Sequence, residues 1–136
     1  MLFRSHIGDK VFLGGNAAVH QFVRVGEGAM IGGVSGITRD VIPFGFAFGP
    51  RADLVGLNVI GLKRRGHSRE DIHRVRRAYR DLFEGPGSFD DRVMAVTTEF
   101  AGDPVVGKIV AFIQASGSRS IMKTAAGADG SDGDMS

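Results

Sequence analysis

The chain has 136 residues, 43% of them hydrophobic, and a formal net charge of +2, so it is long enough for one compact domain or two small ones. It contains no cysteine, which excludes a disulfide, a thiolate nucleophile and a cysteine-bound zinc ion. No apolar run approaches the roughly 20 residues that a membrane span needs, and the first residues lack the apolar segment of a secretory signal peptide, so we expect a cytoplasmic protein.

Residues 7–42 form a repeat of six rungs with six residues each. The first position of every rung is aliphatic, and the fifth is small or β-branched. The first positions are Ile7, Leu13, Val19, Val25, Ile31 and Ile37. The fifth positions are Val11, Ala17, Val23, Ala29, Ser35 and Val41. This regularity predicts a solenoid in which each rung is a short strand with a turn, and each aliphatic residue stacks on its counterparts in neighbouring coils.

Three such rungs close one triangular coil of eighteen residues, so residues 7–42 predict about two coils of a parallel β-helix. An antiparallel sheet with glycine-rich turns is the alternative, but its apolar residues would alternate with a period of two rather than six. A solenoid usually needs about three or more repeats to bury its core. We therefore expect the β-helix of residues 1–42 to be the truncated piece of a longer solenoid, or to pair with another chain.

Glycine, phenylalanine and proline are frequent in residues 43–66, which we interpret as an irregular connector that begins where Pro43 ends the repeat. A small α-helical domain is predicted over residues 67–122, which makes the chain a mixed β and α protein. Residues 123–136 lack apolar bulk and are predicted to be disordered.

Three helices are predicted in the α-helical domain. Ser68 and Asp71 form a capping-box pattern at the start of the first, Ser88 opens the second, and Asp103 followed by Pro104 opens the third. The apolar stripes with helical spacing are Ile72, Val75, Tyr79, Leu82 and Phe83, then Phe89, Val93, Val96 and Phe100, then Val106, Ile109, Val110 and Ile113. Such stripes are expected to face a common core.

Three features follow one another along the chain: the repeat, the segment GGNAAVHQF at residues 14–22, and the segment GLKRRGHSRE at residues 61–70. Together they resemble the C-terminal part of the UDP-N-acetylglucosamine O-acyltransferases that begin lipid A biosynthesis, and the resemblance runs from about Ile7 to Met122. It implies a homotrimer of left-handed parallel β-helices with a C-terminal helical domain. The left hand comes from the resemblance alone, since the general crossover rule favours right-handed connections.

The resemblance also implies a reaction: a 3-hydroxyacyl group moves from acyl carrier protein to the 3-hydroxyl of UDP-N-acetylglucosamine, without cofactor or metal. In this family a histidine acts as general base on that hydroxyl. It lies on coils before the AVHQF segment, so no residue of this chain matches it, and His6 does not fit the context. We therefore expect no catalytic residue in this chain.

The resemblance assigns substrate contacts to five residues. His20 and Gln21 replace the expected glycine corner of their rung and would lie in the cleft between subunits, although a histidine satisfied within the corner is the alternative. Asn58, Arg64 and Arg65 match positions that hold the nucleotide sugar. An arginine fork can clamp phosphate oxygens there, whereas the alternative is a solvated basic turn.

Gly33 matches the position that acts as an acyl-chain ruler, where glycine implies a longer acyl chain, although a glycine that merely forms a turn is the alternative. Three residues depart from the family pattern. Ile60 stands where a glutamate that contacts the nucleotide is common, Phe83 where a tyrosine is common, and Arg51 where a histidine lines the acyl groove in some members.

Eight of the 17 basic residues lie between Lys63 and Arg80. Four side chains spaced by four, three and four residues share one helix face: Arg69, His73, Arg76 and Arg80. Acyl carrier protein is strongly acidic, so this face would attract it electrostatically, while an ordinary solvated face is the alternative. Nucleic-acid binding is not expected, because no aromatic residues are interleaved with the basic ones.

Two further functions stay open at this point. One is a non-catalytic trimerisation or ligand-binding remnant of the same fold. The other is a different hexapeptide protein, such as a small acetyltransferase or a zinc protein. A zinc site between subunits would need several histidines on adjacent rungs, and only His20 lies within the repeat, so no metal is expected.

Overall fold

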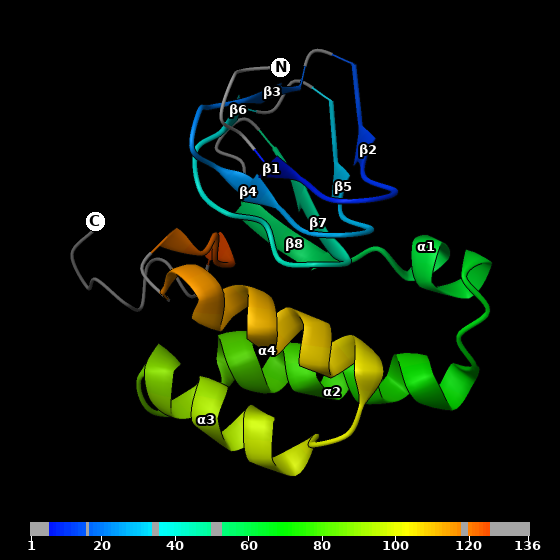
Figure 1. The fold of residues 1–136 in the computed structure, drawn as a ribbon, viewed down its shortest axis with the longest axis vertical. Helices are drawn as coiled ribbons and strands as arrows, with labels where there is room; N and C mark the ends of the chain where they lie inside the picture. Colours follow the sequence, from blue (N-terminus) through cyan, green and yellow to red (C-terminus); the bar gives the residue numbers. More distant parts are fainter. Residues whose placement is uncertain (1–5, 16, 34–35, 50–52, 118–119, 126–136) are drawn as a thin grey trace.

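The computed structural model describes residues 6–15, 17–33, 36–49, 53–117 and 120–125. Its elements are β1 (His6–Ile7), β2 (Phe12–Leu13), β3 (Ala18–Val19), β4 (Arg24–Val25), β5 (Met30–Ile31), β6 (Gly36–Ile37), β7 (Gly45–Phe48), β8 (Asp53–Leu57), α1 (Val59–Arg64), α2 (Arg69–Glu84), α3 (Phe89–Glu99) and α4 (Pro104–Ser116). The strands gather in one half of the molecule, and α2, α3 and α4 pack together in the other half (Figure 1). None of the described helices is long and apolar enough to cross a membrane.

The short strands pair in parallel with strands one coil further along the chain. β1 pairs with β4, β2 with β5 and β3 with β6, and each pair joins residues eighteen positions apart, such as Ile7 with Val25. This register is the coil length expected from three rungs. The first-position residues Val25, Ile31 and Ile37 are at most 2% exposed and fill the interior of the coil as their spacing predicts. In the first rungs burial is less complete, since Ile7 is partly buried and Leu13 is 36% exposed.

The stacking of strands continues beyond Pro43, so the prediction of an irregular connector over residues 43–66 is wrong. β7 pairs in parallel with β5, joining Met30 to Phe46, and then forms an antiparallel pair with β8. Paired residues of β5 and β7 are sixteen positions apart rather than eighteen, so a search for a period of six misses β7. The segment instead alternates with a period of two, with Ala47 fully buried and Phe48 half exposed.

α1 also lies within the expected connector. Asn58 caps it, since the side-chain oxygen accepts a hydrogen bond from the Gly61 amide at 3.0 Å. Leu62 is the buried residue of this helix and joins the core. A six-residue helix with one buried side chain has too little periodicity to be read from sequence.

The three predicted helices α2, α3 and α4 are confirmed. Ser68 and Asp71 form the predicted capping box of α2, and Ser88 and Asp103 cap α3 and α4. The apolar stripes are buried or partly buried, with Tyr79 and Phe89 in the second group. Their buried residues belong to the same core cluster as the interior of the coil, so apolar contacts join the strands to the helices. The division of the chain into domains stays a prediction.

A buried carboxylate fastens the C-terminal segment to the coil. Asp40 is 4% exposed, and its oxygens accept hydrogen bonds from the Arg24 backbone and guanidinium and from the Ser120 hydroxyl. Arg24 also donates to the carbonyl oxygen of Phe112 in α4 at 2.9 Å, and its guanidinium carbon lies 3.9 Å from the centre of that ring. We call these four residues the Asp40 clamp.

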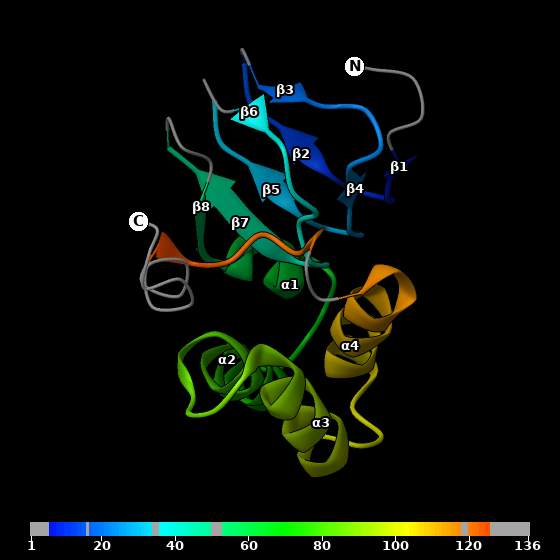
Figure 2. The same ribbon diagram turned by 90° about the vertical axis from the view of Figure 1, so that its left-hand side faces the viewer.

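The chain after α4 runs back along the strands (Figure 2). Asp40 and Ile121 form a parallel bridge, and the Leu54 amide donates to the Lys123 carbonyl oxygen at 3.1 Å. The Lys123 ammonium lies 4.6 Å from the centre of the Phe89 ring. The tail predicted to be disordered therefore does not start at residue 123, since Lys123 is packed. The Lys123 backbone carbonyl pairs with the edge of β8, and its side chain lies over Phe89. Residues 126–136 of that tail lie outside the described residues.

Candidate functional site

His20 and Gln21 lie in the turn between β3 and β4, with both side chains exposed. The His20 amide donates to the Ile37 carbonyl oxygen at 2.9 Å, which fixes the turn on the next coil. Phe22 follows with φ of 69° and is 63% exposed. The turn therefore presents an imidazole, an amide and a phenyl ring on the outside of the coil, which suits a contact with a ligand or another subunit.

The helix α1 meets the coil at a different turn, the one between β4 and β5. The Asn58 side-chain NH₂ donates to the Gly28 carbonyl oxygen there at 2.9 Å. Figures 1 and 2 both show the β3–β4 turn and α1 on different sides of the coil. Within one chain the structure thus does not bring His20 and Gln21 together with the predicted nucleotide-sugar residues.

Arg65 is held in an ion pair, whereas Arg64 is exposed. The Arg65 Nη1 atom lies 2.5 Å from Glu27 Oε2, and its guanidinium carbon lies 4.9 Å from the centre of the buried Phe44 ring. Lys108 in α4 reaches the same Glu27 oxygen at 3.0 Å. Glu27 therefore links α1 and α4 to the β4–β5 turn, and Arg65 has a structural role that its sequence position does not reveal.

Glu27 gives this linkage a dependence on pH. The hydrogen bond from Arg65, followed by that from Lys108, lowers the pKa of Glu27 below its usual value of 4.5. A lowered folded-state pKa means that the ion pairs stabilise the fold above the unfolded-state pKa, and that this stabilisation is lost as the pH falls through the folded-state pKa.

We expect Glu27→Gln to destabilise the chain at pH 7 but to have a progressively smaller effect below about pH 4.5. Urea unfolding of both proteins between pH 3 and pH 7 measures the difference in free energy of unfolding. A difference that grows as the pH falls would contradict the assignment.

Gly33 has a packing reason to be glycine. A Cβ atom on Gly33 would lie 2.8 Å from the carbonyl oxygen of Gly15 in the coil below, closer than real Cβ contacts. The close approach of the two coils therefore accounts for this glycine without reference to an acyl chain. Its role as an acyl-chain ruler stays a prediction.

Two of the three departures from the family pattern can be located. Ile60 is 61% exposed on α1. Phe83 is buried, with ring centres of Tyr79 at 5.1 Å and Phe89 at 5.6 Å on either side, so it packs α2 against α3. Arg51 lies outside the described residues.

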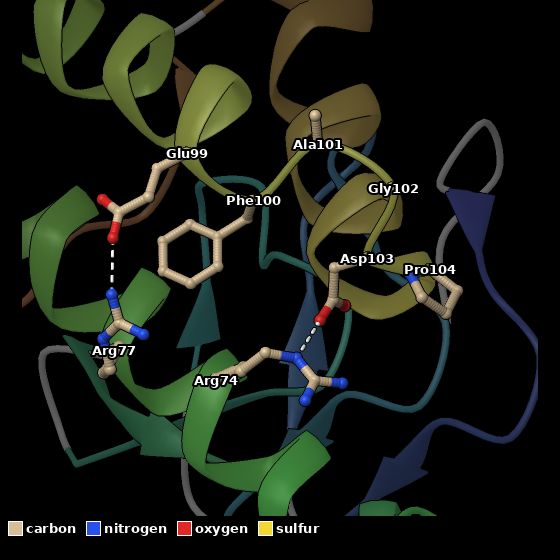
Figure 3. A pocket seen from close by; sticks show the side chains of 8 residues that line it. All are labelled: Arg74, Arg77, Glu99, Phe100, Ala101, Gly102, Asp103 and Pro104. Atoms are coloured by element: carbon tan, nitrogen blue, oxygen red, sulfur yellow. Dashed lines mark hydrogen bonds and ion pairs between the residues drawn. The ribbon is translucent and has the colours of Figure 1, made fainter.

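The basic residues of α2 fall into two groups. Arg74 and Arg77 have acidic partners: Arg74 Nε donates to Asp103 Oδ2 at 3.0 Å, and Arg77 donates to Glu99. Figure 3 shows both pairs around a pocket of about 350 Å³ at the α3–α4 loop. The predicted carrier-protein residues form the other group: Arg69, His73, Arg76 and Arg80. Their side chains are exposed and have no ion pair within the described part of the chain.

A second pocket lies between the end of α1 and the start of α2, and we call it the basic hollow. It has a volume of about 470 Å³ and is lined by Val59, Lys63, His67, Arg69, Ile72, His73 and Arg76. Lys63 and His67 are absent from the residues predicted from sequence, although both belong to the GLKRRGHSRE segment. The run of basic residues was the signal in the sequence that could have indicated these two residues. Only the turn between α1 and α2 arranges their side chains around a pocket.

No group of three or more histidine, aspartate or glutamate side chains that could hold a metal ion occurs among the described residues.

Comparison with known proteins identifies relatives for almost the whole described chain. The family described as Udp N-acetylglucosamine O-acyltransferase, domain 2, matches residues 40–122. The acyl-[acyl-carrier-protein]–UDP-N-acetylglucosamine O-acyltransferase of Paracoccus denitrificans is 49% identical over 114 residues, which are 84% of this chain and 42% of that protein. The enzyme of the same name from Rhizobium johnstonii is 46% identical over 121 residues, 89% of this chain and 44% of that protein.

Solved structures of similar proteins have the same fold. The Arabidopsis UDP-N-acetylglucosamine acyltransferase superimposes with a TM-score of 0.80 at 31% identity, covering 88% of this chain and 44% of that one. The chain therefore spans less than half the length of the relatives it matches.

Proposed function

Because the chain belongs to the UDP-N-acetylglucosamine O-acyltransferase family, we propose that it holds acyl carrier protein and UDP-N-acetylglucosamine for the transfer of a 3-hydroxyacyl group to the sugar 3-hydroxyl, the first step of lipid A biosynthesis. No residue of this chain is assigned the role of general base. The proposal includes the left hand of the coil and a cytoplasmic location.

The observation that carries the proposal is the difference between the two groups of arginines on α2. Arg74 and Arg77 are neutralised by carboxylates of neighbouring elements, whereas the face with Arg76 and Arg80 keeps its charge exposed. Lys and Arg side chains on one face produce a field that attracts an acidic partner and raises its rate of association. An acidic carrier protein fits this face, because its carboxylates would pair with the exposed charges of Arg76 and Arg80.

The nucleotide sugar is assigned to Asn58, Arg64 and Arg65 together with the His20–Gln21 turn. Arg64 is exposed in the last turn of α1 and is available to a phosphate oxygen, while the Glu27 ion pair orients Arg65. The nucleotide-sugar residues and the His20–Gln21 turn occupy different turns of one coil, so a second copy of the chain would have to complete the site with its own His20–Gln21 turn. The proposal places these copies in the homotrimer that the family resemblance implies.

Exposed aromatic side chains also support assembly. Phe12, Phe22 and Phe48 are each more than half exposed on the outside of the coil. Large aromatic residues exposed on strands and turns are enriched at interfaces between subunits.

The carrier-protein face is tested by a pair of variants on the same helix. We expect Arg76→Gln with Arg80→Gln to weaken binding of acyl carrier protein roughly fivefold at low salt, mainly through a slower association rate. Arg77→Gln is the matched control, because it removes a charge already paired with Glu99 and should leave binding unchanged. Surface plasmon resonance at two salt concentrations measures both effects, and equal losses in the two proteins would contradict the proposal.

An assay of acyl transfer from 3-hydroxyacyl carrier protein to UDP-N-acetylglucosamine tests the reaction itself. A chain that binds both substrates but transfers nothing is the ligand-binding remnant considered above, whereas robust transfer would show that this chain supplies its own general base. The match to this family removes the case for a different hexapeptide protein.

A further inference from the structure

The basic hollow concentrates positive charge in a concave site. Five of its seven lining residues carry a basic side chain, namely Lys63, His67, Arg69, His73 and Arg76, and no carboxylate lines it. Like charges held close together repel, so such a cluster costs stability unless it is neutralised. A concave wall focuses the field further than a flat helix face does, which favours an anion inside the hollow.

The nearest carboxylate that pairs with the lining is already in use. Asp71 Oδ2 lies 3.8 Å from His67 Nδ1 but accepts a hydrogen bond from the Ser68 amide at 2.9 Å in the capping box. Its other oxygen accepts one from Arg74 at 2.6 Å. These bonds fix the Asp71 carboxylate at the start of α2 and lower its pKa, so it stays ionised, but among the residues that line the hollow it pairs with His67 alone within the described part of the chain.

The pocket around Arg74 and Arg77 provides an internal comparison (Figure 3). It lies on the same helix and contains two arginines, yet Asp103 and Glu99 supply a carboxylate for each. In this pocket each arginine therefore has its own carboxylate partner within the protein. In the basic hollow, His67 has Asp71 within ion-pair distance, whereas Lys63, Arg69, His73 and Arg76 have no ion pair within the described part of the chain, which favours a ligand as the source of their counter-charge.

The chemistry of the lining indicates the class of anion. Arginine and lysine together offer several N–H donors to a tetrahedral oxyanion, and the apolar floor of Val59 and Ile72 accommodates a short aliphatic substituent. The only aromatic rings in the lining are the imidazoles of His67 and His73, so the hollow lacks the large phenyl, phenol or indole faces on which nucleobases commonly stack. The volume of about 470 Å³ is large enough to admit a phosphate group together with a substituent.

We propose that the basic hollow is a phosphate-binding site, separate from the nucleotide-sugar residues at Asn58 and Arg65. The phosphate group is either free in solution or part of the prosthetic arm that carries the acyl group on a carrier protein. The hollow shares Arg69, His73 and Arg76 with the proposed carrier-protein face, but the phosphate assignment follows from the charge and shape of its own lining rather than from the proposed function.

The test uses inorganic phosphate and the whole chain at constant ionic strength, with chloride as the reference anion. We expect saturable shifts of amide NMR signals confined to residues 59–76, with a dissociation constant on the order of 1 mM. Lys63→Gln and Arg76→Gln should each weaken this binding about fivefold, while Arg77→Gln leaves it unchanged. Shifts that do not saturate, that chloride reproduces, or that Arg77→Gln weakens equally would overturn the proposal.

A second measurement identifies the source of the phosphate. If carrier protein with its phosphate-linked arm binds more tightly than the protein without it, and Lys63→Gln abolishes the difference, the arm occupies the hollow. If both forms bind equally while inorganic phosphate still saturates the site, free phosphate is the ligand. Failure of the carrier protein to bind at all contradicts the proposed function and leaves the phosphate site intact.

Discussion

Replacement of Asp40 by alanine is expected to lower the free energy of unfolding by about 3 kcal/mol, because it leaves a partly buried charge without its partner. Asp40 accepts hydrogen bonds from Arg24 and Ser120, and the Arg24 side chain is only 21% exposed. The variant also frees the segment around Ile121 that runs beside Asp40. For a chain of this length, the loss corresponds to a fall in Tm of about 10 °C by circular dichroism or calorimetry.

Two controls separate this effect from a general loss of charge. Glu99→Gln removes an exposed ion pair with Arg77 and should cost less than about 1 kcal/mol. Asp40→Asn keeps an acceptor for the Arg24 amide and should fall between wild type and alanine. If Asp40→Ala were as stable as Glu99→Gln, the Asp40 clamp would not join the C-terminal segment to the coil.

Gly26→Ala is expected to destabilise the coil by about 3 kcal/mol, since the added methyl group has no space. A Cβ atom on Gly26 would lie 2.6 Å from the Cα atom of Pro43 in the next coil, and backbone cannot move aside as a flexible side chain can. The Gly26 amide donates to the Val41 carbonyl oxygen at 2.8 Å, so any shift of the coil also disturbs this bond. Urea unfolding at equilibrium measures the loss.

Gly36→Ala is the matched control within the same solenoid. No described atom lies within 4 Å of the position of its Cβ, and its backbone does not adopt a positive φ. Alanine there should leave stability unchanged, or raise it by up to about 1 kcal/mol through the entropy of the unfolded chain. Equal destabilisation by both variants would mean that the coils do not stack as closely as Gly26 and Pro43 indicate.

These two sites also bear on binding. The turn that contains Gly26 continues into Glu27, which orients Arg65, and the Asp40 clamp contacts α4, which supplies Lys108. Displacement of the turn that contains Gly26, or of α4 through the Asp40 clamp, would move the side chains assigned to the nucleotide sugar. Stability should therefore be measured alongside binding in every variant of this region.

The sequence by itself determined the elements whose signal is local or strictly periodic. The six-residue spacing of aliphatic residues predicted strands stacked eighteen residues apart, and the pairing of Ile7 with Val25 has that register. Capping residues and apolar stripes predicted α2, α3 and α4, because a helix is specified by neighbours within a few turns. The basic face with Arg76 and Arg80 follows from the same helical spacing.

Tertiary structure decided what depends on residues far apart in the chain. β7 joins the coil at an offset of sixteen residues, and the carbonyl oxygen of Lys123 accepts a bond from Leu54 across 69 positions, so neither has a local pattern. Asn58 and Arg65 look like ligand contacts in the sequence, yet each is also held by the β4–β5 turn. Charge alone does not distinguish Arg76 from Arg77, whereas the position of Glu99 on α3 neutralises one and not the other. Ion pairs and concave sites require side chains from several elements to meet, and only the packing of those elements brings them together.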